Sequence, residues 1–178
     1  MQSFYQALIL AILLLANTAH AGEVRALIER AGFMGTVAAG GSYEWTPEHA
    51  LDLSLGAFPI DSETFYQANF VYRYSRWNSP VKGDMWRPLQ FGFFGVYALN
   101  NKRYFLKSPD KYPYPGYYDE TSFRYGAEFG TTYTFMPSRI AIGYRLRIFD
   151  NGLIATFNNT NRDIQYYISS GFTVQYLF

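Results

Sequence analysis

The sequence predicts an all-β protein, an eight-stranded antiparallel transmembrane β-barrel. Three observations predict it. Apolar and polar side chains alternate over residues 164–178, which is the period of a strand with one apolar and one polar face. Aromatic residues make up 20% of the chain, as expected for the aromatic girdles of such barrels. After residue 21 there is no run of about 18 apolar residues, the length that a transmembrane helix needs.

The first 21 residues have the features of a secretory signal peptide. An apolar run covers residues 4–16 and is followed by Ala19-His20-Ala21, a small-x-small pattern of the kind that signal peptidase cleaves. The run is too short to span a bilayer. We therefore expect residues 1–21 to be removed. Residues 22–178 would then form one barrel domain in the outer membrane of a Gram-negative bacterium.

Six more segments share the two-residue period of the C-terminal segment. The clearest is 123–135, in which the odd positions are Phe, Tyr, Ala, Phe, Thr, Tyr and Phe, and the even positions include Arg, Glu and two Gly. This arrangement is typical of a strand that faces lipid on one side and a polar lumen on the other. The seven segments predicted as strands are 36–45, 51–57, 66–75, 89–99, 123–135, 140–149 and 164–178.

Single-chain bacterial barrels have an even number of strands, so an eighth is needed. One candidate is 22–32. The alternative makes 22–32 a short periplasmic helix and divides 139–157 into two strands at the turn Asn151-Gly152. Loop lengths favour the first, because it places the turns 46–48 and 136–138 in the periplasm and the long 100–121 loop outside, as is usual.

Charged residues occur singly at the inward positions of these strands. An eight-stranded barrel is just wide enough for side chains to fill its interior, and buried charges must be paired. We expect one group near the periplasmic end (Arg25, Glu44, Asp52 and Arg73) and a second nearer the outside (Glu128, Arg145 and Arg147), with Glu29 and Arg124 also inward. Bulky Phe94 and Tyr167 in the lumen likewise favour a structural plug over a solute pathway.

The loop 100–121 is rich in tyrosine and lysine. Tyrosines are common at binding surfaces, and the basic residues of 102–111 could meet lipopolysaccharide phosphates. The alternative is a loop stiffened by proline whose aromatic rings lie at the level of the lipid headgroups. The candidate surface-binding residues are Tyr104, Tyr112, Tyr114, Tyr117 and Tyr118.

Other chemistry has little support in the sequence. The chain has no cysteine, which excludes a lipoprotein anchor and disulfides, and its net charge of +1 gives no reason to expect a nucleic-acid partner. We expect no metal and no cofactor, because zinc-like and calcium-like ligand spacings are missing. His49 and Ser54 would point to opposite faces of one strand, so we interpret His49 as an interfacial turn residue.

The strand order, the long 100–121 loop and the segment 140–153 resemble the PagL-like lipid A 3-O-deacylase barrels. That family carries a His-x-Ser pair near the outer end of this strand. The corresponding residues here are Leu146-Arg147-Ile148-Phe149, so no catalytic residue is carried over, since a serine nucleophile needs a base. The last strand, ending at Phe178, resembles the C-terminal strand that the barrel assembly machinery recognises in outer-membrane barrels. This resemblance implies that machinery as a partner.

The expected function is therefore non-enzymatic. We predict a barrel with a plugged polar interior and a structural or surface-interaction role through the 100–121 loop, with outer-membrane lipid and lipopolysaccharide as its surroundings. Two alternatives stay open: a lipid A-modifying enzyme and a narrow pore.

Overall fold

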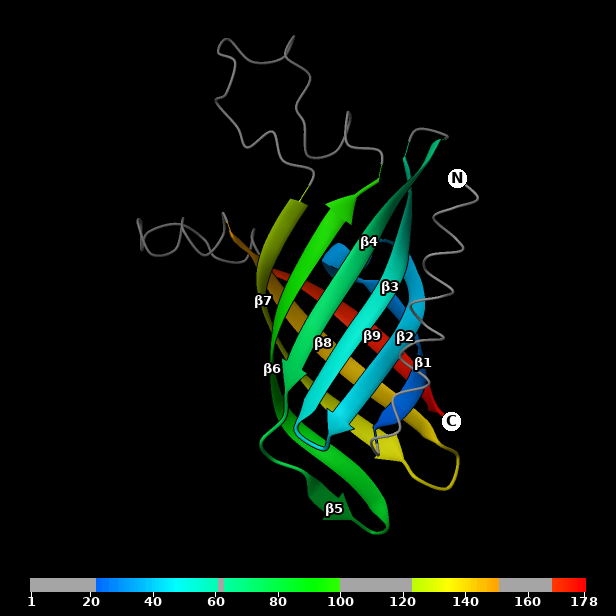
Figure 1. The fold of residues 1–178 in the computed structure, drawn as a ribbon, viewed down its shortest axis with the longest axis vertical. Helices are drawn as coiled ribbons and strands as arrows, with labels where there is room; N and C mark the ends of the chain where they lie inside the picture. The colour runs from blue at the N-terminus through cyan, green and yellow to red at the C-terminus, as the bar shows by residue number, and fades with distance from the viewer. Residues whose placement is uncertain (1–21, 61–62, 100–122, 151–167) are drawn as a thin grey trace, which may run out of the picture.

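The computed structural model describes residues 22–60, 63–99, 123–150 and 168–178. They form a closed antiparallel barrel of eight strands (Figure 1). Hydrogen bonding follows the chain order and closes between the last strand and the first. The barrel strands are β1 (Glu23–Ala31), β2 (Val37–Thr46), β3 (His49–Ile60), β4 (Glu63–Tyr74), β6 (Asp84–Ala98), β7 (Phe123–Phe135), β8 (Ile140–Phe149) and β9 (Ile168–Leu177).

The fold predicted from the sequence is confirmed, including its eighth strand. Residues 23–31 pair with both β2 and β9, so the alternative of a helix at 22–32 is wrong. The short strand β5 (Ser79–Val81) lies outside the ring and pairs only with the start of β6, as the extension below the barrel in Figure 1. In the described part of the chain, no helix is long and apolar enough to cross a bilayer.

The barrel has two different ends. We call one the turn end, because it carries the connections 47–48, 75–83 and 136–139. The first residues of β1 and the last residues of β9 also lie there. We call the other the loop end, because it carries the connections 32–36, 61–62, 99–122 and 150–167. The two tight turns expected on one side therefore do share an end. The candidate tyrosines at 104, 112, 114, 117 and 118, and Tyr167, lie outside the described residues.

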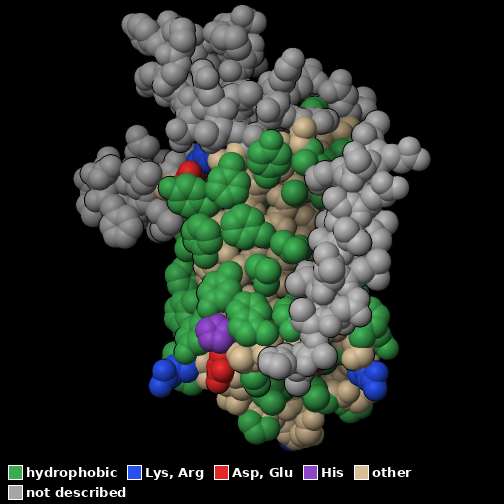
Figure 2. Space-filling view, viewed as in Figure 1, with side chains coloured by type: hydrophobic (Ala, Val, Ile, Leu, Met, Phe, Trp, Pro, Cys, Tyr) green, Lys and Arg blue, Asp and Glu red, His purple; other side chains and the backbone are tan. Residues whose placement is uncertain are grey.

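Side chains alternate between the outside and the lumen along the barrel strands, except where the pairing of β6 with β7 shifts between Arg87 and Gln90. In β9 the even-numbered residues Phe172, Val174 and Tyr176 are exposed and the intervening residues are buried. Figure 2 shows hydrophobic side chains covering the middle of the face formed by β3, β4 and β6, with charged groups at its upper and lower borders. The aliphatic and aromatic belt predicted from the period of two thus lies on the outside of the barrel.

At the loop end, the connection between β1 and β2 folds into the lumen. It forms a short 3₁₀ turn, η1 (Gly32–Met34). Gly35 leaves this turn with φ +113°, and a Cβ there would lie 2.9 Å from the backbone nitrogen of Ala57, so glycine is required. The turn places Met34, which is 1% exposed, in the barrel's apolar layer, whose other members are Ala38, Val71, Phe94 and Val96.

Candidate functional site: the ionic interior

Below the apolar layer, the lumen is filled by ion pairs. Among the described residues, ion pairs of the barrel join six arginines to six carboxylates, and one of these pairs, Arg124–Asp150, lies at the loop end, where Arg124 is in register with Val96 of the apolar layer. The arginines are Arg25, Arg73, Arg87, Arg124, Arg145 and Arg147, and the carboxylates are Glu23, Glu29, Glu44, Asp52, Glu128 and Asp150. The balance of charge fits the requirement that buried ions be compensated.

Glu128 on β7 is the centre of this network. One of its oxygens, Oε1, accepts a hydrogen bond from Arg73 Nε at 2.5 Å and lies 3.7 Å from Arg145 Nε. Its other oxygen forms an ion pair with Arg147. Two further carboxylates complete the cluster, since Arg73 also pairs with Asp52 and Arg147 with Glu29. Three cations therefore share three anions out of contact with solvent.

Arg145 is held mainly by neutral groups. Its Nη1 donates to Gln90 Oε1 at 2.9 Å and to the carbonyl oxygen of Thr131 at 2.8 Å, and its Nη2 donates to Thr132 Oγ1 at 2.6 Å. Since its ion pair with Glu128 is long, these hydrogen bonds supply much of the compensation for burying the guanidinium.

A second cluster lies at the turn end. Glu44 on β2 forms an ion pair with Arg25 Nη2 at 2.8 Å and accepts a hydrogen bond from Arg87 Nη1 at 2.7 Å. Arg25 also pairs with the half-exposed Glu23 at 3.0 Å, and Arg87 Nε donates to Asn78 Oδ1 at 2.7 Å. This cluster closes the lumen on the side opposite η1.

The structure corrects the grouping expected from strand order. Arg73, which was expected with Arg25 and Glu44, lies with Glu128 instead. The reason is Gly92 on β6, which stands in register between Arg73 on one side and Glu128 on the other. A Cβ at this position would lie 3.1 Å from the Cβ of Glu128, so the missing side chain leaves room for the arginine to reach across β6. Asp52 belongs to the cluster around Glu128 for the same reason, because it forms an ion pair with Arg73.

Other inward glycines make the same kind of room. Gly171 on β9 separates the strands of Glu29 and Arg147, and a Cβ there would lie 3.2 Å from Glu29 Oε1. At Gly130 and Gly143, a Cβ would meet Arg145 nitrogens at 2.5 and 2.9 Å. Inward glycine beside inward arginine is therefore a signal in the sequence from which contacts between non-adjacent strands could be predicted.

Sequence reasoning missed three members of the network, Glu23, Arg87 and Asp150, and the last two lie at irregular positions. Arg87 shares its odd parity with the outward Leu89 and Phe91, so simple alternation puts it outside. The pairing of β6 with β7 shifts between Arg87 and Gln90, a β-bulge that turns Arg87 inward. Asp150 directly follows β8 and pairs with Arg124, whose guanidinium also lies 5.5 Å from the centre of the Phe149 ring.

His49 lies at the turn end, on the outside of the barrel. Its Nδ1 is 2.7 Å from the hydroxyl oxygen of Tyr72, and its ring stacks on Trp45. Ser54 instead accepts a hydrogen bond from Asn69 at 3.2 Å. The structure therefore does not bring this histidine and this serine together as a catalytic pair. Within the described ranges, no three His, Asp or Glu side chains are grouped as metal ligands.

Comparisons with known proteins add no family to this description. No protein-family model matches the sequence, and no curated protein matches it. The resemblance to the PagL-like deacylases thus has support only at the level of a small antiparallel barrel. Chemically, the described interior holds guanidinium and carboxylate groups in mutual contact, which suits a rigid filling.

Proposed function

We propose that this chain is an outer-membrane barrel of a Gram-negative bacterium with a closed interior and no catalytic activity. On this proposal residues 1–21 direct export. The barrel then serves as a structural element of the envelope that presents the 100–121 loop, with its five candidate tyrosines, at the cell surface. The observation that carries the proposal is the neutral ionic network that fills the described lumen between the turn end and the apolar layer.

The outer surface supports the membrane part of the proposal. The eight barrel strands have 9 to 15 residues, and a tilted strand needs roughly 9–11 to cross a bilayer. Large aromatic residues lie outward near both ends, among them Trp45 and Trp86 toward the turn end and Tyr66, Tyr97 and Tyr125 toward the loop end. Two aromatic girdles around an apolar band are the usual exterior of such barrels.

Current measurements in a planar lipid bilayer distinguish a closed barrel from a narrow pore. We expect the purified chain, after reconstitution, to give no steady single-channel current, because the paired arginines and carboxylates leave no continuous water path. Co-flotation with lipid vesicles confirms insertion in the same preparation, and a porin serves as the positive control. Steady unitary currents from inserted protein would contradict the proposal and support the pore.

The surface role requires the loop end to face outward. An epitope inserted between residues 113 and 116 is expected to bind antibody on intact cells, since long connections of these barrels are extracellular and short turns periplasmic. The control is the same epitope placed in the turn 136–139. If only the turn epitope is accessible on intact cells, the orientation is reversed and the proposed role of the tyrosines fails.

A further inference from the structure

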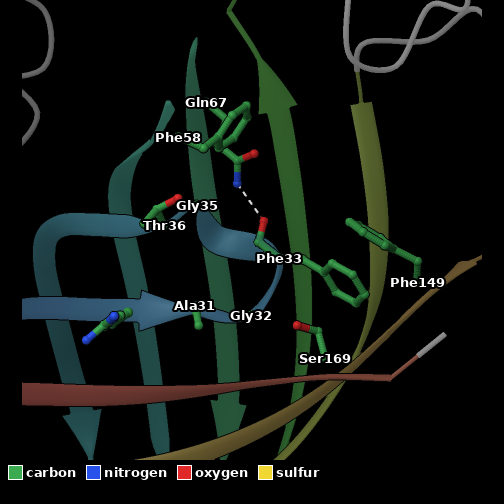
Figure 3. A pocket seen from close by; sticks show the side chains of 10 residues that line it. Ala31, Gly32, Phe33, Gly35, Thr36, Phe58, Gln67, Phe149 and Ser169 are labelled. Carbon is green, nitrogen blue, oxygen red and sulfur yellow. Dashed lines mark hydrogen bonds between the residues drawn. The ribbon is translucent and has the colours of Figure 1, made fainter. Parts of the chain in front are cut away.

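The mouth of the barrel at the loop end contains a cavity of about 510 Å³. This is within the usual range for small-molecule sites, which bury a ligand among apolar groups with a few polar anchors. Its lining is shown in Figure 3 and comes from η1, β3, β4, β8 and the two strands β1 and β9. The cavity lies on the loop-end side of the cluster around Glu128 and shares no residue with that cluster.

The floor of the cavity is aromatic and closed. The rings of Phe33 and Phe149 lie next to each other, with centroids 3.9 Å apart, as Figure 3 shows. Gln67 fixes η1 from above by donating a hydrogen bond to the carbonyl oxygen of Phe33 at 2.7 Å, and Phe58 lines the same side. A molecule that entered the mouth would therefore meet apolar rings, and the arginine network beneath would stop it from passing through.

The wall of the barrel is low on one side of this cavity. β1 ends at Ala31 and β2 begins at Val37, whereas β3 continues three residues past Ala57, the partner of Val37. On the other side, β9 begins three residues beyond Gly171, the partner of Ala31. Three residues of strand span about 10 Å. The β1–β2 hairpin is therefore shorter than its neighbours by about this length, and we call this step in the described wall the notch.

Arg30 lies at this notch and lines the cavity. It is exposed, next to the outward-facing Val37 and Phe172 in register. Among the described residues it has no ion-pair partner, unlike the six arginines of the interior. An exposed cation at the edge of an apolar cavity favours a ligand that has an anionic group at one end.

We propose that the mouth cavity binds a single-chain or aromatic amphiphile that carries one anionic group. The apolar part would lie against Phe33, Phe58 and Phe149, the hydroxyls of Thr36 and Ser169 would border it, and the anionic group would lie beside Arg30. Three phenyl rings offer contact for one chain or one ring system. The ligand class is therefore a fatty-acid-like carboxylate or an aromatic sulfonate or phosphate. Because the floor is closed, the cavity would hold such a ligand and would not pass it through the barrel.

Two fluorescent probes test both parts of the site. The protein is reconstituted in phosphatidylcholine nanodiscs, and empty discs are subtracted. The anionic probe is 1-anilinonaphthalene-8-sulfonate, and N-phenyl-1-naphthylamine has the same rings without the sulfonate. We expect saturable binding of both. Arg30→Gln should weaken only the anionic probe, by about tenfold, which corresponds to one charge-assisted hydrogen bond. Arg76→Gln removes an exposed arginine away from the cavity and should change neither.

A second pair of variants tests the cavity itself. Ser169 lines it, whereas Ser170 is exposed on the opposite face of the same strand. Ser169→Phe should abolish binding of both probes, and Ser170→Phe, which adds the same ring outside, should leave both unchanged. Equal binding by these two variants, or no saturable binding by the unaltered protein, would overturn the site. Equal affinities of the Arg30→Gln and Arg76→Gln proteins for the sulfonate would overturn its anionic character.

Competition identifies the source of the ligand. Added dodecanoate is expected to displace the sulfonate probe, and phosphatidylglycerol incorporated into the disc is expected not to displace it. Displacement by the phospholipid alone would overturn the single-chain assignment. Failure of the chain to enter discs at all is visible separately by size-exclusion chromatography, and it would contradict the proposed membrane location and not the cavity.

Discussion

Replacing Glu128 by Gln is expected to lower the free energy of unfolding by about 3–5 kcal/mol, the usual cost of removing one partner from a buried ion pair. The change keeps the size of the side chain and removes its charge. Arg73, Arg145 and Arg147 would then share only Asp52 and Glu29. Urea titration of the reconstituted protein, followed by tryptophan fluorescence, measures the effect.

Glu48→Gln is the matched control, because Glu48 is exposed in the turn 47–48 and surface charges contribute about 0–1 kcal/mol. A second comparison adds Arg145→Gln. In the Glu128→Gln background this change should cost less than in the unaltered protein, because it restores the charge balance of groups that interact. Equal losses for Glu128→Gln and Glu48→Gln would contradict the central position of Glu128.

Replacing Phe129 by Lys is expected to destabilise the inserted barrel by about 2–4 kcal/mol, the penalty for lysine at the midplane of a lipid-facing strand. Phe129 lies at the middle of β7, is 44% exposed, and packs edge-on against Phe91 with ring centroids 5.6 Å apart. The measurement is the urea midpoint in vesicles, with the yield of refolded protein as a second readout.

The control for this change is Met136→Lys. Met136 is also exposed, but it lies in the turn that follows β7, where the charge would meet water and should have little effect. A difference of less than about 0.5 kcal/mol between the two variants would mean that Phe129 does not face hydrocarbon.

Local periodicity was sufficient to predict the barrel, because each strand has to place apolar residues on one face and polar residues on the other. The segment 123–135 illustrates this, since Phe123, Phe129 and Phe135 are exposed and Glu128 is buried. The eighth strand followed from a global requirement, the even strand number, combined with loop lengths. Both kinds of argument use only the order of residues along the chain.

The contacts inside the lumen were less predictable because they depend on neighbours that are two strands apart. Arg73 reaches Glu128 only because Gly92 between them has no side chain, and Arg87 points inward only because of the bulge before Gln90. The inward turn η1 was missed for a similar reason. Its path depends on the positive φ angles at Ala31, Gly32 and Gly35, and hydrophobic alternation carries no information about them.

A cysteine scan of β9 tests the central claim most directly, that apolar side chains face lipid while polar and ionic groups fill a closed lumen. The chain has no cysteine, so single cysteines can be placed at positions 172–177 and labelled with bimane in the unfolded state. After refolding into vesicles that contain brominated phosphatidylcholine, we expect strong quenching at 172, 174 and 176 and little at 173, 175 and 177. Uniform quenching, no quenching at the even positions, or the reverse pattern would contradict the claim.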